Sequence, residues 1–229
     1  MDNILDLPER TWVNKTVQKN AFYQRADSGR KGALQEFLEQ EVQEIVWLYK
    51  LHPSTFSVKP GEVVEEIDVF VFRMKYDYYA LPPIQEIDGL LPRQTLLFVE
   101  YGVSRDLVLN VKQKNEVKGE QVWKIVQTEM QRHVDMGRFA LHFEGLSMDS
   151  YFAKMLGQVS GFHTLTIADY KVSAEIRSQI EKLRKQVLAL QKQISKEKQF
   201  NRQVELNAEA RQLKKEISAL EDRMKKIHL

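Results

Sequence analysis

An aspartate and a lysine on one predicted strand come closest to a catalytic set in this sequence. Asp68 lies near the start of residues 65–75, a segment rich in β-branched and aromatic residues, and Lys75 ends it. Nucleases of the restriction type carry acidic residues on one strand and an acid-x-Lys triplet on the next, and these bind a metal that activates a water. Glu41 and Glu44, on a predicted helix, are the residues that could complete such a set.

The nuclease pattern is incomplete in this chain. The triplet before Lys75 begins with Arg73 where an acid is needed, and the next predicted strand offers Glu100 with no lysine after it. We therefore interpret Asp68 and Lys75 as surface or ion-pair residues at strand ends. A degenerate metal-dependent nuclease therefore remains only a weak functional hypothesis.

The sequence contains no motif for other familiar kinds of catalytic or phosphate-binding site. The sequence lacks GxGxxG, GxxxxGK[ST] and G-x-S-x-G, so it has none of the usual phosphate loops or nucleophile elbows. It contains no cysteine, and its five histidines do not occur at the i, i+4 spacing of a helical metal site. His142 falls on a predicted strand and is interpreted as a core residue. We expect no catalytic residue, no metal and no cofactor.

The end of the chain carries the clearest structural pattern, a helical segment without glycine or proline. Its apolar residues recur in alternating steps of four and three, the spacing of a coiled-coil seam. The first seam comprises Ile176, Ile180, Leu183, Val187, Leu190 and Ile194, and the second comprises Leu206, Ala210, Leu213, Ile217, Leu220, Met224 and Ile227.

The two seams are mirror images about Phe200. Each residue of the first seam has a counterpart in the second at equal sequence distance from Phe200, as Leu190 has in Ala210. Antiparallel pairing produces this symmetry, whether the chain folds back as a hairpin or two unbroken helices form a dimer. The sequence leaves both arrangements open. Thr166 and Asp169 have the spacing of a capping box at the helix start.

Charge divides the chain unequally. From Tyr170 onward there are 15 Lys and Arg against 8 Asp and Glu, a net charge of +7, so residues 1–169 carry −5 of the total of +2. A basic rod suits an acidic protein or a nucleic-acid backbone. Because its basic residues alternate with acidic ones, as on a solvated helix face, a protein partner is favoured over nucleic acid.

The remaining sequence predicts an α+β or mixed α/β fold, a small mixed sheet flanked by helices and followed by an antiparallel coiled-coil region. We expect an irregular N-terminal arm at 1–30, a mixed α/β domain at 31–165 and the helical coiled-coil region at 166–229. Within the domain, a helix is predicted from Gly32 to Tyr49, stopped by His52 and Pro53. Strands are predicted at 65–75, 95–101, 107–112, 122–126 and 139–143, and further helices at 84–91 and 148–159.

The sequence also bounds the cellular context. The N-terminus lacks the basic start and apolar block of a signal peptide, and no apolar run is long enough to span a membrane. We therefore expect a cytoplasmic protein that does not bind membranes.

Several motifs together resemble a bacterial family catalogued as a domain of unknown function, number four-three-nine-one. They are residues 7–11 (LPERT), 13–15 (VNK), 47–51 (WLYKL), 66–70 (EIDVF), 87–88 (ID), 91–92 (LP) and 197–207 (EKQFNRQVELN). The resemblance implies an accessory subunit beside helicase and methyltransferase genes of restriction-like or antiphage systems, and it implies no catalytic residue. It also implies an acidic residue in the strand where this chain has Val71 and Arg73, which weakens the nuclease hypothesis further.

The longest of these motifs lies at the mirror point of the seams, so we predict that it contacts the partner. The predicted partner-binding residues are Glu197, Phe200, Asn201, Arg202, Glu205 and Asn207. The resulting hypothesis is a non-enzymatic interaction subunit of a DNA-processing or antiphage defence system, which binds a helicase or methyltransferase of that system through its coiled coil. Self-association and a nucleic-acid-binding adaptor are the alternatives.

Overall fold

A computed structural model describes residues 5, 7–117, 120–135, 141, 145–161 and 166–227. The chain forms two compact units, residues 1–162 and 163–229. The predicted α+β class is confirmed in its coarse form: the first unit holds a mixed sheet with helices, and the second holds two helices that pack together. None of the described helices is long and apolar enough to cross a membrane.

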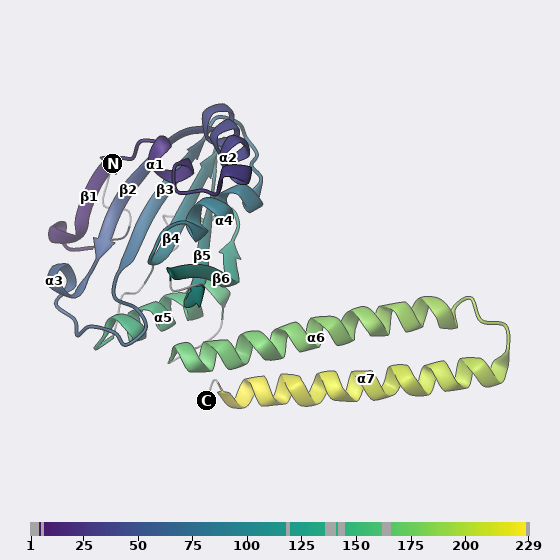
Figure 1. Cartoon of the computed structure of the whole chain (residues 1–229). Coiled ribbons are helices and arrows are strands. Elements are labelled where there is room, and N and C mark those ends of the chain that lie inside the picture. The colour runs from purple at the N-terminus through teal and green to yellow at the C-terminus, as the bar shows by residue number, and fades with distance from the viewer. Residues whose placement is uncertain are drawn as a thin grey trace. The chain divides into compact units, whose positions relative to one another are not determined.

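The sheet has six strands that lie in sequence order (Figure 1). Neighbouring strands are antiparallel except β3 and β4, which are parallel and joined by helix α4 (Leu81–Gly89). This is the predicted strand–helix–strand unit, since a parallel pair needs a crossover connection. The strands are β1 (Trp12–Thr16), β2 (Val42–Leu51), β3 (Ile67–Met74), β4 (Gln94–Tyr101), β5 (Ser104–Val117) and β6 (Glu120–Gln131).

Helices α1 (Asn20–Tyr23), α2 (Ser28–Gln40) and α4 lie together on one face of the sheet (Figure 1). Their apolar side chains form a core with the strand residues that point to the same face. Phe22 and Leu38 from the helices meet Phe72 and Leu97 from the strands, and all four are buried. Burial of this apolar surface is the main force that holds the helices on the sheet.

Helix α5 (Met148–Ser160) packs against β5 and β6. A capping box between Ser147 and Ser150 begins it, and Gly161 ends it with a positive φ of 76°. The carboxylate of Asp149, in the first turn, accepts hydrogen bonds from the backbone N–H groups of Glu62 at 2.8 Å and Val64 at 2.7 Å. Helix α5 thereby fixes the loop that leads into β3. Two short helices, η1 (Glu9–Thr11) and α3 (Pro53–Phe56), complete this unit.

Two sequence predictions for the first half of the chain are wrong. The segment from Val42 to Tyr49, predicted as the second half of a helix, is strand β2. Residues 12–16, within the predicted irregular arm, form the edge strand β1 and pair with β2. Pairing with neighbouring strands, and not the local sequence pattern, determines that both segments are strands. The predicted strand at 139–143, with His142, falls almost wholly outside the described residues.

The second unit is a helical hairpin. Helices α6 (Ile167–Ile194) and α7 (Phe200–Ile227) run antiparallel and pack together within one chain (Figure 1). The predicted capping box begins α6: the side chain of Thr166 accepts from the N–H of Asp169, and the side chain of Asp169 accepts from the N–H of Thr166. At about 1.5 Å per residue, each 28-residue helix is about 42 Å long.

Candidate interaction surface of the hairpin

The seam residues turn away from solvent along both helices. Leu190, Leu206 and Ala210 form a buried cluster, and Ile194 and Leu213 pack against it. The other seam positions are also withdrawn from solvent: Ile176, Ile180 and Val187 are buried, and Leu183, Ile217, Leu220, Met224 and Ile227 are half-buried. The apolar periodicity therefore selects the faces that meet.

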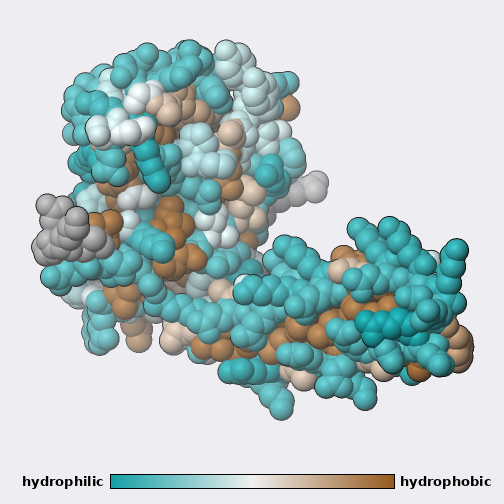
Figure 2. Space-filling view, turned by 45° about the vertical axis from the view of Figure 1, so that its right-hand side comes forward, coloured by the Kyte–Doolittle hydropathy of each residue, from teal (hydrophilic) through white to brown (hydrophobic). Residues whose placement is uncertain are grey.

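An ion pair joins the two helices in the same antiparallel arrangement. Arg184 on α6 lies 2.8 Å from the carboxylate of Glu221 on α7. Both side chains are substantially exposed, so this pair contributes about 0.2–1 kcal/mol and serves register more than stability. Two helices alone leave a seam partly open, and Figure 2 shows an apolar stripe running along the hairpin between hydrophilic side chains.

The turn between the helices, residues 195–199, is closed by side chains, without glycine or proline. One oxygen of the Glu197 carboxylate accepts from the N–H groups of Lys198 at 2.8 Å and Gln199 at 2.9 Å. The side-chain amide of Gln203 donates to the carbonyl oxygen of Glu197 at 2.6 Å. Hydrogen bonds of this capping kind give the turn a defined conformation.

The predicted partner-binding residues divide into two groups. Glu197 builds the turn, Asn207 donates to the carbonyl oxygen of Gln203 at 2.8 Å, and Arg202 pairs with Glu205 at 2.6 Å. Phe200 and Asn201 take no part in this network and are exposed.

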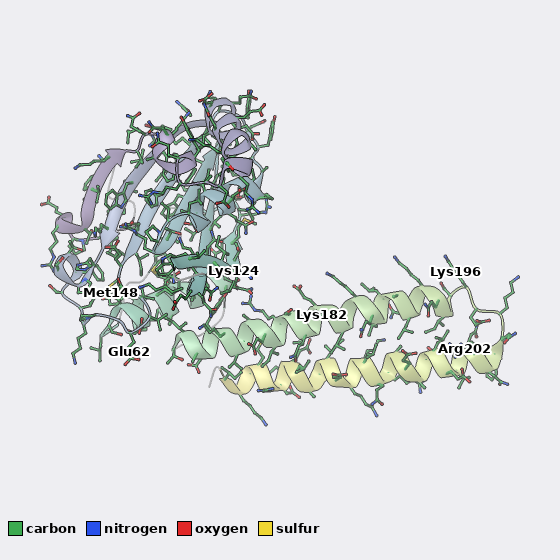
Figure 3. The ribbon with its side chains drawn as sticks, viewed as in Figure 1. Glu62, Lys124, Met148, Lys182, Lys196 and Arg202 are labelled. Atoms are coloured by element: carbon green, nitrogen blue, oxygen red, sulfur yellow. The ribbon has the colours of Figure 1, made fainter. Side chains whose placement is uncertain are left out.

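Phe200 is the largest apolar side chain that this turn presents to solvent. It is 75% exposed, and Val204, one helical turn later, is 51% exposed. Figure 3 shows Arg202 and Lys196 at the same end of the hairpin. We call this end, residues 196–207, the apex. It combines an exposed aromatic ring with cations on a backbone fixed by hydrogen bonds.

The residues of the nuclease hypothesis do not converge. Asp68 is the second residue of β3 and Lys75 follows the end of this strand, so about 23 Å of strand separates them. The Lys75 ammonium donates to the carbonyl oxygen of Glu39 at 2.6 Å, and Glu44 pairs with Arg73. Among the described residues, no three His, Asp or Glu side chains gather as metal ligands would.

Asp68 itself is held by cations and an indole. Its carboxylate accepts from the Trp47 indole at 3.0 Å and lies 3.1 Å from the Arg93 guanidinium. Burial raises the pKa of this carboxyl to about 6, against an ordinary value of 3.8. A guanidinium in contact opposes a metal cation at the same oxygens, so the environment of Asp68 is that of a structural ion pair.

A buried polar network joins α4 to the sheet. Lys112 on β5 donates to the carboxylate of Asp88 at 2.9 Å, and neither side chain reaches solvent. Thr95 and Asn110 also donate to the Asp88 carboxylate, the latter at 2.7 Å. Burial lowers the pKa of Lys112, and the carboxylate of Asp88 opposes that shift. Since every partner is satisfied, the network specifies how α4 docks.

A second polar group surrounds Asp106, which is fully buried at the β5 start. It accepts from the hydroxyls of Tyr79 at 2.7 Å and Tyr101 at 2.9 Å, and from the backbone N–H of His133 at 2.9 Å. Burial, with the hydrogen bond to Asp106 next in size, raises the pKa of both tyrosines. Sequence reasoning missed this group because its members come from separate segments with no motif spacing.

The Asp106 group borders an open hollow of about 570 Å³. Ser104 and the ring of His133 line it, 3.2 Å apart, which resembles a nucleophile and its base. A catalytic triad needs a carboxylate on the second ring nitrogen, whereas Asp106 holds the backbone of His133. The hydrogen bond from His133 to Asp106 therefore positions the loop after β6.

A family model matches most of the chain. The model of a family described as "Domain of unknown function (DUF4391)" matches residues 5–217. No curated protein and no solved structure matches the chain. The match covers both the sheet unit and most of the hairpin.

Proposed function

The chain belongs to the DUF4391 family, the family that its motifs resemble, and from that premise we propose a non-enzymatic interaction subunit. Its hairpin, with the two seams packed as a coiled coil, binds a protein partner at the apex. The resemblance to this family favours a cytoplasmic DNA-processing or antiphage defence system, with a helicase or methyltransferase as the partner.

The exposed ring of Phe200 is the observation that carries this proposal. An aromatic side chain that is 75% exposed in the free chain leaves its apolar surface in water, which burial against a partner would relieve. Aromatic and arginine side chains supply much of the energy of protein interfaces. The turn is already fixed by the hydrogen bonds that Glu197 accepts and that the Gln203 amide donates, so little ordering entropy is lost on binding.

The chemistry of the apex also indicates what the partner surface is. Phe200 and Val204 require an apolar pocket, and they are flanked by Lys196, Lys198 and Arg202. Arg202 is already paired with Glu205, so it attracts acidic groups of the partner less strongly than the two lysines do. The matching surface is therefore an apolar pocket with acidic residues at its rim.

Capture of the partner from the native host tests the proposal. The tagged full-length chain is compared with a Phe200→Ala, Arg202→Ala variant and with a matched control, Leu188→Ala, Arg211→Ala. Leu188 is 58% exposed and Arg211 is exposed, and both lie away from the apex. The wild type and the control should retain the same partner, and the apex variant should lose it with unchanged helicity.

Retention of the partner by the apex variant would refute binding at the apex. Light scattering of the purified chain is the accompanying measurement. A monomer agrees with a hairpin that has its apex free, whereas an obligate dimer that buries Phe200 would leave no apex for another protein.

A further inference from the structure

The outer face of α6 carries a row of lysines. Lys182, Lys185, Lys192 and Lys196 follow one another in steps of three, seven and four residues. Such steps keep residues on one side of an α-helix. Lys196 continues the row just beyond α6, because its N–H still bonds to the carbonyl oxygen of Gln193 at 3.0 Å. Figure 3 shows Lys182 and Lys196 on the side of α6 turned away from α7.

No acidic side chain lies within the stretch that carries these lysines. Residues 182–196 contain five basic residues and no acidic one. Arg184 is paired with Glu221, but the four lysines of the row are exposed and form no ion pair with any described residue. Two other hairpin cations do have acidic partners: Arg202 pairs with Glu205, and Lys225 pairs with Asp222. Between Lys182 and Lys196 this face therefore carries one sign of charge, and the acidic residue that borders it is Glu181, four residues before Lys185.

The geometry of the row fits a polyanion. Fourteen residues separate Lys182 from Lys196, which is about 21 Å along a helix. Four like charges on one face repel each other, so a ligand that brings regularly spaced negative charge is favoured. Lysine ammonium groups on flexible stems can follow phosphates without strict geometry. Ala189, which lies on the same face between Lys185 and Lys192, offers neither a stacking group nor a base-reading group.

We propose that Lys182, Lys185, Lys192 and Lys196 bind the phosphate backbone of a nucleic acid without sequence preference. Contacts of this kind fix position on a nucleic acid and carry no base information. Lys196 belongs to both the row and the apex, whereas Lys182, Lys185 and Lys192 lie on α6 outside the apex. This proposal therefore goes beyond the proposed function and does not rest on it. The chain would then hold a nucleic acid on α6 while its apex contacts a protein.

Fluorescence anisotropy of labelled nucleic acid tests the row in the full-length chain. The probes are a DNA duplex, one of its strands alone, and the corresponding RNA duplex. The test variant replaces all four lysines of the row by glutamine. A matched control replaces Lys214, Lys215, Lys225 and Lys226 on α7 by glutamine, and it changes the net charge equally. A third variant replaces the row by arginine.

The expected result is binding by the wild type that weakens with salt, with a slope of log K against log salt of about −3.6 for four phosphate contacts on duplex DNA. The glutamine row should lose roughly tenfold or more in affinity and most of this slope, while the arginine row and the α7 control should retain both. Circular dichroism checks that all variants keep their helicity.

Three outcomes overturn the proposal. The first is no binding of any nucleic acid by the wild type at low salt. The second is equal loss in the glutamine row and the α7 control, which would show only an effect of total charge. The third is binding of phosphatidylserine vesicles without binding of nucleic acid, which would assign the row to a membrane surface.

Discussion

Leu190 and Ala210, each ten residues from Phe200, lie in one buried cluster between α6 and α7. This pairing across the hairpin is the physical consequence of the mirrored seams. Apolar spacing that is symmetric about one residue can be buried along its whole length only when the two arms run in opposite directions. The position of the turn is therefore set by the symmetry of the seams, and its shape by Glu197 and Gln203.

The seam should dominate the stability of the hairpin. Leu206→Ala removes a side chain that is 5% exposed, and we expect a loss of about 2 kcal/mol in the free energy of unfolding, at the low end for a buried leucine because the seam is thin. Leu188→Ala, at a position 58% exposed, should change it by under about 0.5 kcal/mol. Urea denaturation followed by helical circular dichroism measures both, and equal losses would contradict the seam.

The buried network at Asp88 should matter far more than surface charge on the same helix. Asp88→Ala leaves Lys112 without its carboxylate partner, so we expect a loss of about 3–5 kcal/mol. The control is Glu86→Ala, which removes an exposed pair with Arg30 at 3.4 Å and should cost under about 1 kcal/mol. Chemical denaturation followed by tryptophan fluorescence compares them, and a tolerated Asp88→Ala would show that the network is dispensable.

Asp68 should give the sheet unit a defined pH dependence. Its pKa in the folded chain, about 6, lies above the ordinary value of 3.8. At pH values between these two, the folded state therefore binds more protons than the unfolded state. The contribution of this carboxyl to stability is therefore present at low pH and is lost as the pH rises through about 6.

The Asp68→Asn variant isolates this contribution, because asparagine stays neutral and can still accept from Trp47. The free energy of unfolding of the variant minus that of the wild type should rise between about pH 4 and pH 6 and then level off, by up to about 3 kcal/mol. Denaturant titrations over this range measure the difference. A flat or falling difference would show that ion pairing to Arg93 outweighs burial.

The sequence predicts the antiparallel pairing of the two helical arms, without deciding between a hairpin and a dimer, and it predicts most of the sheet. It misreads β2, for a physical reason. The strand is bulged twice, between Val42 and Glu44 and between Trp47 and Tyr49. Each bulge shifts the alternation of faces by one residue. The buried positions Val42, Ile45 and Tyr49 therefore fall at helical spacing, and a strand takes on the pattern of an amphipathic helix.

The candidate surfaces differ in how far the sequence could reveal them. The apex follows from the motif at residues 197–207 and the symmetry point, although its division into turn-building and exposed residues needs the hydrogen bonds. The spacing of the lysines in residues 182–196 already contains the row. It is overlooked when charges are counted along the chain without assigning each one to a face of the helix. The Asp106 group has no local signal, because Tyr79 and His133 reach it only through the folded sheet.

Disulfide trapping in the cysteine-free chain tests the central claim, an antiparallel hairpin within one chain, most directly. Leu190→Cys, Ala210→Cys should oxidise to a monomer with one internal disulfide, since both side chains lie in one cluster. The mismatched pair Leu190→Cys, Ile217→Cys should not, because seven residues of α7, about 10 Å, separate Ile217 from Ala210. Covalent dimers from the matched pair, or equal internal trapping of both pairs, would contradict the hairpin on which the apex and the lysine row depend.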